Sequence, residues 1–532
     1  MIKKVMDFLK EWRVAIVLAA AFIAFQVLIL QVDLAQLPNG TIWLGAHSVN
    51  TSDMAVYLGY LAQGKNSFLI SNLFNDHPQI PRFDAFWSIA GLLVRAGMAP
   101  VVAHEALRYL CGIILAFSVY AAAKAMTKNR KDAVRTTFFL AVGMAAGWIN
   151  GIWLGIVTAP DPARAMSPDL ETEFGLVPML LGGAHMILSL ALQLAFARWA
   201  WDGINHKNWR KTLLACLTVA YFTAFHPYFI SWAGLFVVIA MLWRVKREEL
   251  LPRAKHFLAI CAAMLPSAAY YIYLLADDTA FREHHTLANK LPLEHPLIWA
   301  VALSPIAIAG IWQWFKRNKH EGSRLNDVSW IWAWLASAVV CMLLPFPWTA
   351  KYTQGLLLVL TALTLPAWLA AADWAAKRVF WLRWMLIGLC LLPILYLFKQ
   401  EMTVNASMKW NGNFYQYVST MRAVRYLGQN SPPDAITVAP NTLIDLWTPA
   451  YAARHAWIGH PHETPDYQDR LAEFKKWATS TNSGDFLSFL DAKSISYVIL
   501  PKDPNSDYVK FFDVTWRRIF EQEGAQVWER VR

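Results

Sequence analysis

The carboxylate Asp53 stands in the segment TSDMAVYLGYLAQGK, just after the first long apolar run of the chain. This segment predicts a helix, and a carboxylate in a first helical turn can cap it and interact favourably with the helix dipole. A carboxylate that reaches an acceptor hydroxyl can instead take its proton as a general base. Asp53 is therefore a candidate for capping and for catalysis. Asp76 and His77, further along the same loop, are candidates for substrate binding.

A second loop contains Asp169 and Glu171 in a D-x-E arrangement. Two carboxylates with this spacing can offer hard oxygen ligands to Mg²⁺ or Mn²⁺, which require several oxygen ligands. Acidic pairs in loops also commonly bind nothing. The pair therefore predicts either a divalent metal cofactor or a solvated loop.

Several cationic or histidine side chains are candidates for binding an anionic substrate. His226 interrupts a long apolar stretch, where an ionisable group is costly and usually faces a cavity or a partner. A neutral histidine that hydrogen-bonds a helix end is the alternative. Lys351 could hold a lipid phosphate or extend to the membrane surface. Arg282, His284 and His285, from a third loop, are the remaining candidates.

The composition indicates which class of fold positions these residues. Of 532 residues, 57% are hydrophobic, 16% are charged and 27 are tryptophan, which excludes an ordinary soluble enzyme. Apolar runs have the length of about 20 residues that a helix needs to cross a bilayer. We therefore expect a mainly α, polytopic membrane protein with about eleven spans, at residues 14–32, 101–123, 136–157, 177–197, 212–226, 228–243, 257–276, 297–315, 328–346, 354–372 and 379–398.

The distribution of Lys and Arg predicts the orientation of these spans. Most of the Lys and Arg residues in the gaps between spans lie on the same side as the N-terminus, so the positive-inside rule makes that side cytoplasmic. An odd number of spans then places the C-terminal portion outside, in the periplasm or beyond the cell. The short basic start without transit features favours a bacterial inner membrane. The net charge of +11 lies in the cytoplasmic loops, so no nucleic-acid partner is expected.

Two further segments define the expected domains. The first external loop contains AVYLGYLA and AFWSIAGLLVRAGM, which are too short to cross the membrane but suited to interfacial helices. After residue 398 the short strands AITVAP, SYVILP and AQVWERV alternate with amphipathic helices. This alternation predicts a small external α/β domain at 399–532 with a partly parallel sheet, after a transmembrane catalytic domain at 1–398. A lid or docking role is expected for it.

The layout resembles the polyprenyl-phosphate-dependent glycosyltransferases of the GT-C superfamily. One span leads into a long external loop that opens with an acidic residue in TSDMAVYLGYLAQGK and closes with HPQIPRFDAFWSIAGLLVRAGMAP. Many spans precede a C-terminal part with APNTLIDLWTPAYAARHAWIGHPHETPDYQDRLAEF, which looks like the tail of bacterial members. The sequence departs from members with two adjacent acids, because Asp53 lies between Ser52 and Met54.

The resemblance implies inverting transfer of a hexose or pentose from a polyprenyl-phosphate donor to a glycan, lipid or protein acceptor at the external face. Asp53 would be the general base. Lys351, with Arg282, His284 or His285, would stabilise the leaving lipid phosphate. Membrane lipid is a further expected partner.

Three alternatives remain open on the sequence. A transporter or flippase of lipid-linked or glycan substrates is the rival from a different class, although transporters often show internal repeats and keep ionisable groups near the midplane. A polysaccharide polymerase or ligase would differ only in its acceptor. A membrane anchor for a receptor-like domain would not need eleven spans.

Overall fold

The chain divides into two compact units in the computed structural model. The helical unit comprises Met1–Ile29, Arg108–Tyr273 and Asn289–Glu401, and the mixed unit comprises Leu30–Leu107, Leu274–Ala288 and Met402–Arg532. The segment expected to be the first external loop, named so from here on, thus belongs to the same unit as the C-terminal segment. The structure describes residues 2–47, 51–76, 79–146, 149, 174–278, 281–282, 296–316, 324–345, 348–378, 380–406, 411–478, 483–502 and 507–531.

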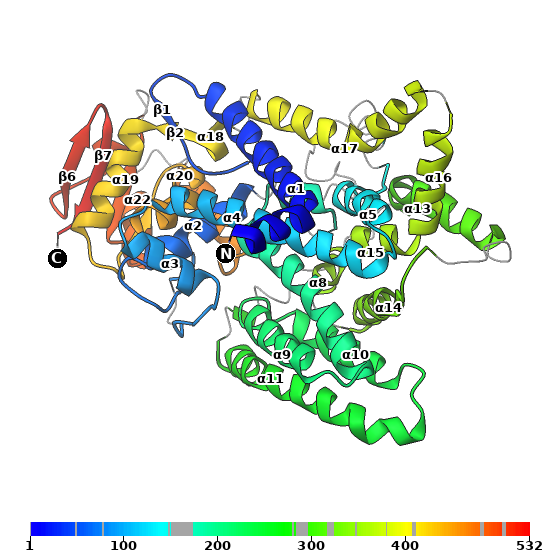
Figure 1. The fold of residues 1–532 in the computed structure, drawn as a ribbon. Coiled ribbons are helices and arrows are strands. Elements are labelled where there is room, and N and C mark those ends of the chain that lie inside the picture. The colour runs from blue at the N-terminus through cyan, green and yellow to red at the C-terminus, as the bar shows by residue number, and fades with distance from the viewer. Residues whose placement is uncertain are drawn as a thin grey trace. The chain divides into compact units, whose positions relative to one another are not determined.

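A helix overlaps each of the eleven apolar segments expected to span the membrane (Figure 1). These helices are α1 (Ile2–Ala35), α4 (Pro100–Met126), α5 (Arg130–Val142), α8 (Ala184–Asn205), α9 (Trp209–Thr223), α10 (Phe229–Leu242), α11 (Leu250–Asp277), α13 (Pro296–Lys316), α14 (Ser329–Leu343), the pair α15 (Leu356–Leu363) and α16 (Leu365–Ala376), and α17 (Phe380–Ala406). The short helices α7 (Leu176–Met179), η2 (Arg247–Glu249) and η4 (Thr349–Thr353) lie between them.

Within the described ranges, four helices are long and apolar enough to cross a membrane: α1, α4, α11 and α13. A bent pair, η4–α15 with α16, would make five, and α10 and α14 are shorter apolar helices. The count of eleven spans therefore stays a prediction. The single helix expected at 354–372 is broken, with a bend of 55° between residues 363 and 365. Pro366 follows the break, and a proline lacks the N–H that a continuous helix needs there.

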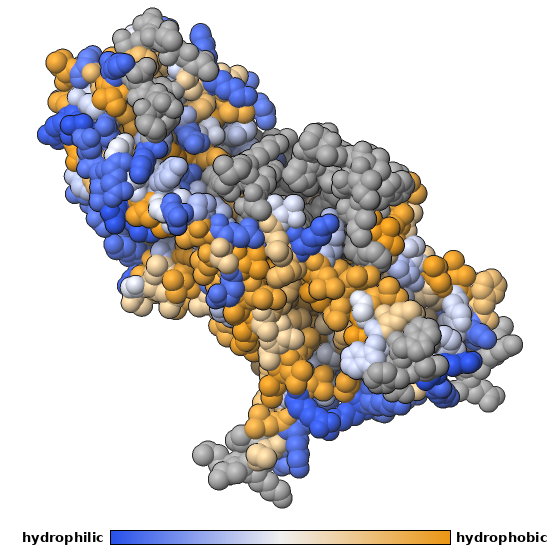
Figure 2. All heavy atoms as spheres, turned by 90° about the horizontal axis from the view of Figure 1, so that it is seen from above, coloured by the Kyte–Doolittle hydropathy of each residue, from blue (hydrophilic) through white to orange (hydrophobic). Residues whose placement is uncertain are grey.

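The surface of the helical unit has the character expected next to lipid. On α11, Leu251, Leu258, Leu265 and Ile272 recur every seven residues, and each is 61 to 72% exposed. A seven-residue repeat keeps side chains on one helical face, so α11 presents an apolar stripe. Broad hydrophobic areas are also visible on the face of the molecule in Figure 2. The protein is accordingly a membrane protein.

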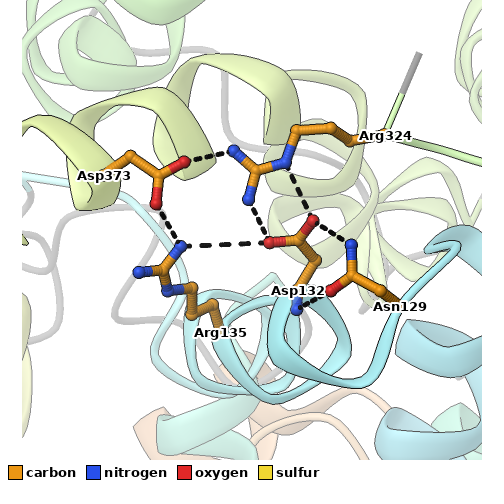
Figure 3. A network of polar contacts seen from close by, with 5 residues as sticks. All are labelled: Asn129, Asp132, Arg135, Arg324 and Asp373. Atoms are coloured by element: carbon orange, nitrogen blue, oxygen red, sulfur yellow. Dashed lines mark hydrogen bonds and ion pairs between the residues drawn. The ribbon is translucent and has the colours of Figure 1, made fainter. Parts of the chain in front are cut away.

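An ionic network joins three segments of the helical unit (Figure 3). Asp132, in the first turn of α5, is 1% exposed and accepts hydrogen bonds from Arg324, with Nε 2.8 Å away. Arg324 also pairs with Asp373 of α16, which lies 2.6 Å from Arg135. Asn129 caps α5 by accepting the N–H of Asp132. The network thus fixes the start of α5 to α16 and to the segment before α14.

We expect Asp132→Asn to lower the free energy of unfolding by about 1 to 3 kcal/mol, because Arg324 then loses one of its two charged partners. Burial alone would raise the pKa of Asp132, but the hydrogen bonds from Arg324 and Asn129 outweigh it and hold the pKa below its usual range. A carboxylate with a lowered pKa stabilises the fold above its unfolded pKa and loses this effect as the pH falls. Thermal unfolding of the two proteins should therefore differ at neutral pH and converge in acid.

The control is Glu248→Gln, at an exposed position of η2. It should unfold like the wild type at every pH. An Asp132→Asn protein as stable as the wild type at neutral pH would show that the network contributes nothing.

The mixed unit contains a five-stranded sheet in the order β4-β3-β5-β7-β6. Strand β3 is parallel to β4 and β5, whereas β7 is antiparallel to β5 and β6. Figure 1 shows α19 beside β6 and β7. The elements are β2 (Tyr415–Tyr417), α18 (Asn411–Phe414), α19 (Val418–Asn430), β3 (Ile436–Val438), α20 (Thr442–Ala452), β4 (His455–Ala456), α21 (Tyr467–Ala478), α22 (Ser483–Ala492), β5 (Tyr497–Leu500), η6 (Asp507–Phe511), β6 (Trp516–Gln522) and β7 (Ala525–Arg530).

Aromatic side chains form the core of this sheet domain. Trp457, Phe474, Trp477 and Phe486 are buried together with Val498 of β5. Burial of large aromatic side chains contributes strongly to stability, and their ring contacts add to it. The helices α21 and α22 supply several of these rings, so they are fixed against the sheet through its core.

The first external loop pairs with the C-terminal segment through backbone contacts. Strand β1 (Thr41–Trp43) is antiparallel to β2. Two further contacts lie beyond this pair: the N–H of Ala456 donates to the carbonyl of Leu73 at 2.9 Å, and the Asn72 side chain donates to the carbonyl of Glu463 at 2.8 Å. Because backbone groups must be paired when buried, these bonds hold the loop and the C-terminal segment in one unit.

Helix α2 (Thr51–Gln63) carries Asp53 and packs against α20 and α3 (Trp87–Arg95). Its residues Met54 to Leu61 are mostly buried, so its apolar side faces protein and not the membrane interface that the sequence suggested. A Cβ added at Gly64 would lie 2.3 Å from the Cα of Gly91. Only glycine permits this approach of the end of α2 to α3, which fixes the axis of α2 and hence the direction of Asp53.

Candidate active site

Asp53 and His460 form a hydrogen-bonded pair within the mixed unit. The Oδ1 atom of Asp53 lies 3.0 Å from Nε2 of His460, although the residues are 407 positions apart in sequence. The Asp53 side chain is 39% exposed, whereas the His460 side chain is 2% exposed. The Asp53 carboxylate is thus held by the buried His460 while it remains open to solvent. Helix capping alone does not require such a partner.

The backbone around His460 determines which ring nitrogen carries the hydrogen. Its Nδ1 atom accepts the N–H groups of His462 and Glu463, both at 3.1 Å. A nitrogen that accepts hydrogen bonds carries no hydrogen, so the neutral ring has its hydrogen on Nε2. The Nε2–H group therefore donates to Asp53. This donation orients the carboxylate.

The position of His460 depends on close packing beside it. The His460 ring lies 5.8 Å from the ring of Phe74, which belongs to the first external loop. A Cβ added at Gly459 would lie 2.9 Å from the Phe74 ring and 3.2 Å from the backbone of Asp445. The glycine therefore lets the segment after β4 approach α20 and Phe74. His460 is delivered to Asp53 by this packing and not by a regular helix or strand.

The other predicted residues of the mixed unit have protein partners. Asp76 forms an ion pair with Arg470 of α21 at 2.7 Å, which ties the loop to that helix. Arg282 donates to the carbonyls of Leu275 and Ala276 at the end of α11. These contacts position both side chains, and substrate binding by Asp76 and Arg282 stays a prediction. His77, His284 and His285 lie outside the described residues.

His226 and Lys351 belong to a second group, within the helical unit. His226 is buried in the turn between α9 and α10, and Lys351 lies in η4. The Lys351 Nζ atom is 6.0 Å from the Tyr228 ring, whose centroid is 6.3 Å from that of His226. His185, in the first turn of α8, places its ring 4.9 Å from His226. The Lys351 ammonium is the charged group among these residues, and it is a candidate contact for an anionic group.

The sequence missed His460 and His185. His460 stands in the quoted segment ARHAWIGHPHET, where a second histidine two positions later was the available signal. His185 lies two residues after a pair of glycines, at a helix start. A histidine in such a position does not by itself indicate a binding site. Neither residue could be paired with its partner from spacing, because the partners come from other segments.

The proposed metal ligands Asp169 and Glu171 lie outside the described residues, so Mg²⁺ or Mn²⁺ stays a prediction. Elsewhere in the mixed unit, Oδ2 of the buried Asp33 lies 2.6 Å from Nδ1 of His47. Oxygen and imidazole nitrogen are suitable ligands for divalent ions. Here the two atoms are engaged in a short hydrogen bond with each other, so they could bind an ion only after that bond opens.

No protein-family model matches the sequence, and no curated protein matches it. Solved structures do. The arabinofuranosyltransferase AftD from Mycobacteria aligns with a TM-score of 0.53 at 12% identity, over 98% of this chain and 40% of that chain. ArnT from Cupriavidus metallidurans bound to undecaprenyl phosphate gives 0.49 at 11% identity, over 95% and 97%. The archaeal oligosaccharyltransferase AglB from Archaeoglobus fulgidus, in complex with an inhibitory peptide and a dolichol-phosphate, gives 0.46 at 12% identity, over 92% and 70%.

These structural neighbours are membrane glycosyltransferases of the GT-C superfamily, and the chain has the GT-C type of fold. The alignment with AftD carries this conclusion, and this chain spans less than half of the AftD chain. The resemblance noted in the sequence is thereby confirmed at the level of the fold.

We expect His460→Phe to lower the rate of the sugar transfer that the sequence resemblance implies about tenfold, the lower end of the effect of losing one hydrogen bond to a charged group. Phenylalanine keeps the ring packed against Phe74 but lacks the Nε2–H group and also the Nδ1 atom that accepts the N–H groups of His462 and Glu463. Thermal unfolding is therefore measured beside the rate. A purely structural role for His460 would lower the stability and leave the rate of the folded protein unchanged.

The matched control is His462→Phe, because His462 is exposed and only its backbone N–H contacts the His460 ring. This variant should retain the wild-type rate. If both variants transfer sugar at the wild-type rate, His460 does not act through Asp53.

Proposed function

We propose that the protein transfers a sugar from a polyprenyl-phosphate donor to an acceptor hydroxyl, with inversion at the anomeric carbon. The observation that carries this proposal is the partly exposed Asp53 carboxylate, held 3.0 Å from a buried His460 Nε2–H in a chain with a GT-C fold. In the reaction the acceptor oxygen attacks the anomeric carbon of the donor sugar. The bond between that carbon and the lipid phosphate breaks at the same time. Asp53 takes the acceptor proton.

The leaving polyprenyl phosphate carries the electron pair of the broken bond. It needs positive charge or hydrogen-bond donors, which an enzyme supplies in advance at the point where charge develops. Lys351, whose Nζ atom lies 6.0 Å from the Tyr228 ring in the helical unit, is suited to this role. The sugar is a hexose or pentose, and the acceptor is a glycan, a lipid or a protein.

We further propose that the C-terminal segment and Asp53 are on the external side of a bacterial inner membrane. The excess of Lys and Arg in the gaps on the side of the N-terminus supports this orientation. Donor and acceptor would then meet at the outer face, where water-borne acceptors arrive.

The test uses the full-length protein in sealed liposomes with labelled polyprenyl-phosphate hexose or pentose and a panel of acceptors. Transfer should occur when the acceptor is on the side of the C-terminal segment, with inverted anomeric configuration in the product. Release of unlabelled polyprenyl phosphate should match the sugar transferred. Movement of the intact donor across the bilayer without transfer to any acceptor would identify a flippase and overturn the proposal.

A further inference from the structure

A polar cavity lies at the N-terminal end of α1 in the helical unit, remote in sequence from the residues of the proposed reaction. Its volume is about 500 Å³, and α1, the end of α4 and the start of α5 line it. Its charged lining residues are Lys10, Lys124, Lys128 and Arg130, together with Asp7 and Glu11. The cavity is therefore a concave site that is open to solvent, with Lys10, Lys128 and Arg130 exposed.

Cations exceed anions in this cavity. Glu11 is neutralised by Lys124 at 2.5 Å, which leaves three cations against Asp7. The Arg130 guanidinium donates to the carbonyl of Lys10 at 2.6 Å, so its direction is fixed. A guanidinium has five N–H donors and can hold this carbonyl and an anion together. The cavity is thus prepared for a phosphate-sized anion.

The surroundings of the cavity favour a lipid over a free anion. Tyr120 lines the cavity and contacts Trp12, whose ring stacks on Phe117 and on Phe8. Tryptophan and tyrosine rings are typical of the membrane–water interface. Phe8 is 48% exposed and lies in the helix that begins the first predicted span. These rings therefore form an aromatic path from the cavity to the exposed Phe8 on α1.

We propose that this cavity binds the headgroup of an anionic glycerophospholipid of the membrane. Its phosphate would contact Lys10, Lys128 and Arg130, and its acyl chains would lie along the aromatic path through Trp12 to Phe8. Basic pockets between membrane helices at the cytoplasmic side have this chemistry. The bound lipid would join α1 to the start of α5.

The experiment is native mass spectrometry of the full-length protein in detergent, titrated with dioleoyl-phosphatidylglycerol or dioleoyl-phosphatidylcholine. The wild type should bind phosphatidylglycerol at least about tenfold more tightly, given the contribution of each cation near an anionic lipid. Lys10→Ala with Lys128→Ala should remove this preference. Both positions are exposed, so the fold should be retained, which a thermal unfolding curve checks.

The matched control is Lys246→Ala with Arg247→Ala, which removes two exposed cations from another loop. It should keep the preference for phosphatidylglycerol. Equal loss in both double variants, or no loss in the cavity variant, would overturn the proposal. Displacement of phosphatidylglycerol by equimolar glycerol phosphate would assign the cavity to small anions and also overturn it. Binding of polyprenyl phosphate without any binding of phosphatidylglycerol would also overturn the proposal.

Discussion

Asp53→Asn should fold and insert normally but lose sugar transfer by at least about a hundredfold, the lower end of what base assistance contributes. Asparagine caps a helix about as well as aspartate and can still accept a hydrogen bond from His460 Nε2–H. The substitution therefore removes the basicity of the side chain and leaves its local contacts. Initial rates with saturating donor and acceptor, on protein with unchanged thermal unfolding, provide the measurement.

A matched control exists in the same unit. Asp469 is an exposed carboxylate in the first turn of α21, the same helical position as that of Asp53 in α2. Asp469→Asn should transfer sugar at the wild-type rate. If Asp53→Asn also retains a near wild-type rate, Asp53 is a helix cap and the catalytic assignment is refuted.

Lys351→Met should reduce transfer about a hundredfold, comparable with the removal of one group that stabilises developing negative charge. Methionine keeps much of the length and the apolar stem of lysine, so contacts with the Tyr228 ring can persist without the charge. Inhibition by added polyprenyl phosphate should weaken at the same time, because this product carries the charge that Lys351 would meet. Rates and inhibition constants from one donor titration test both effects.

Two comparisons define the role of the charge. Lys351→Arg retains a cation and should keep more activity than Lys351→Met, whereas Lys377→Met, at an exposed position after α16, should have no effect. Wild-type inhibition by polyprenyl phosphate in Lys351→Met would contradict phosphate binding by this lysine and leave the role of Asp53 untouched.

The sequence indicated the positions of the helices closely. Each expected span overlaps a helix, because hydrophobic length and composition are local properties that a short window of sequence contains. The break before Pro366 also had a local signal, which the even hydrophobicity of the segment concealed. The helix that starts at Thr51, with Asp53 in its first turn, likewise follows from neighbouring residues.

The neighbours of α2 could not be predicted from its own residues. Its apolar residues predicted an interfacial helix, since membrane lipid and a protein neighbour both select the same hydrophobic side chains. The structure places α20 and α3 against it. Whether lipid or protein covers an apolar helix face depends on segments that are distant in sequence. The close approach of Gly64 to Gly91 likewise depends on the positions of both α2 and α3.

By itself, the sequence determined that this is a helical membrane protein and that Asp53 begins a helix after the first apolar run. It also carried the family resemblance that the fold confirms. Only the tertiary structure decided that His460 meets Asp53, because a pairing across 407 residues depends on the β1–β2 strand pair and the packing at Gly459. Local patterns specify elements, whereas the chemistry of a side chain depends on partners that folding brings to it from elsewhere in the chain.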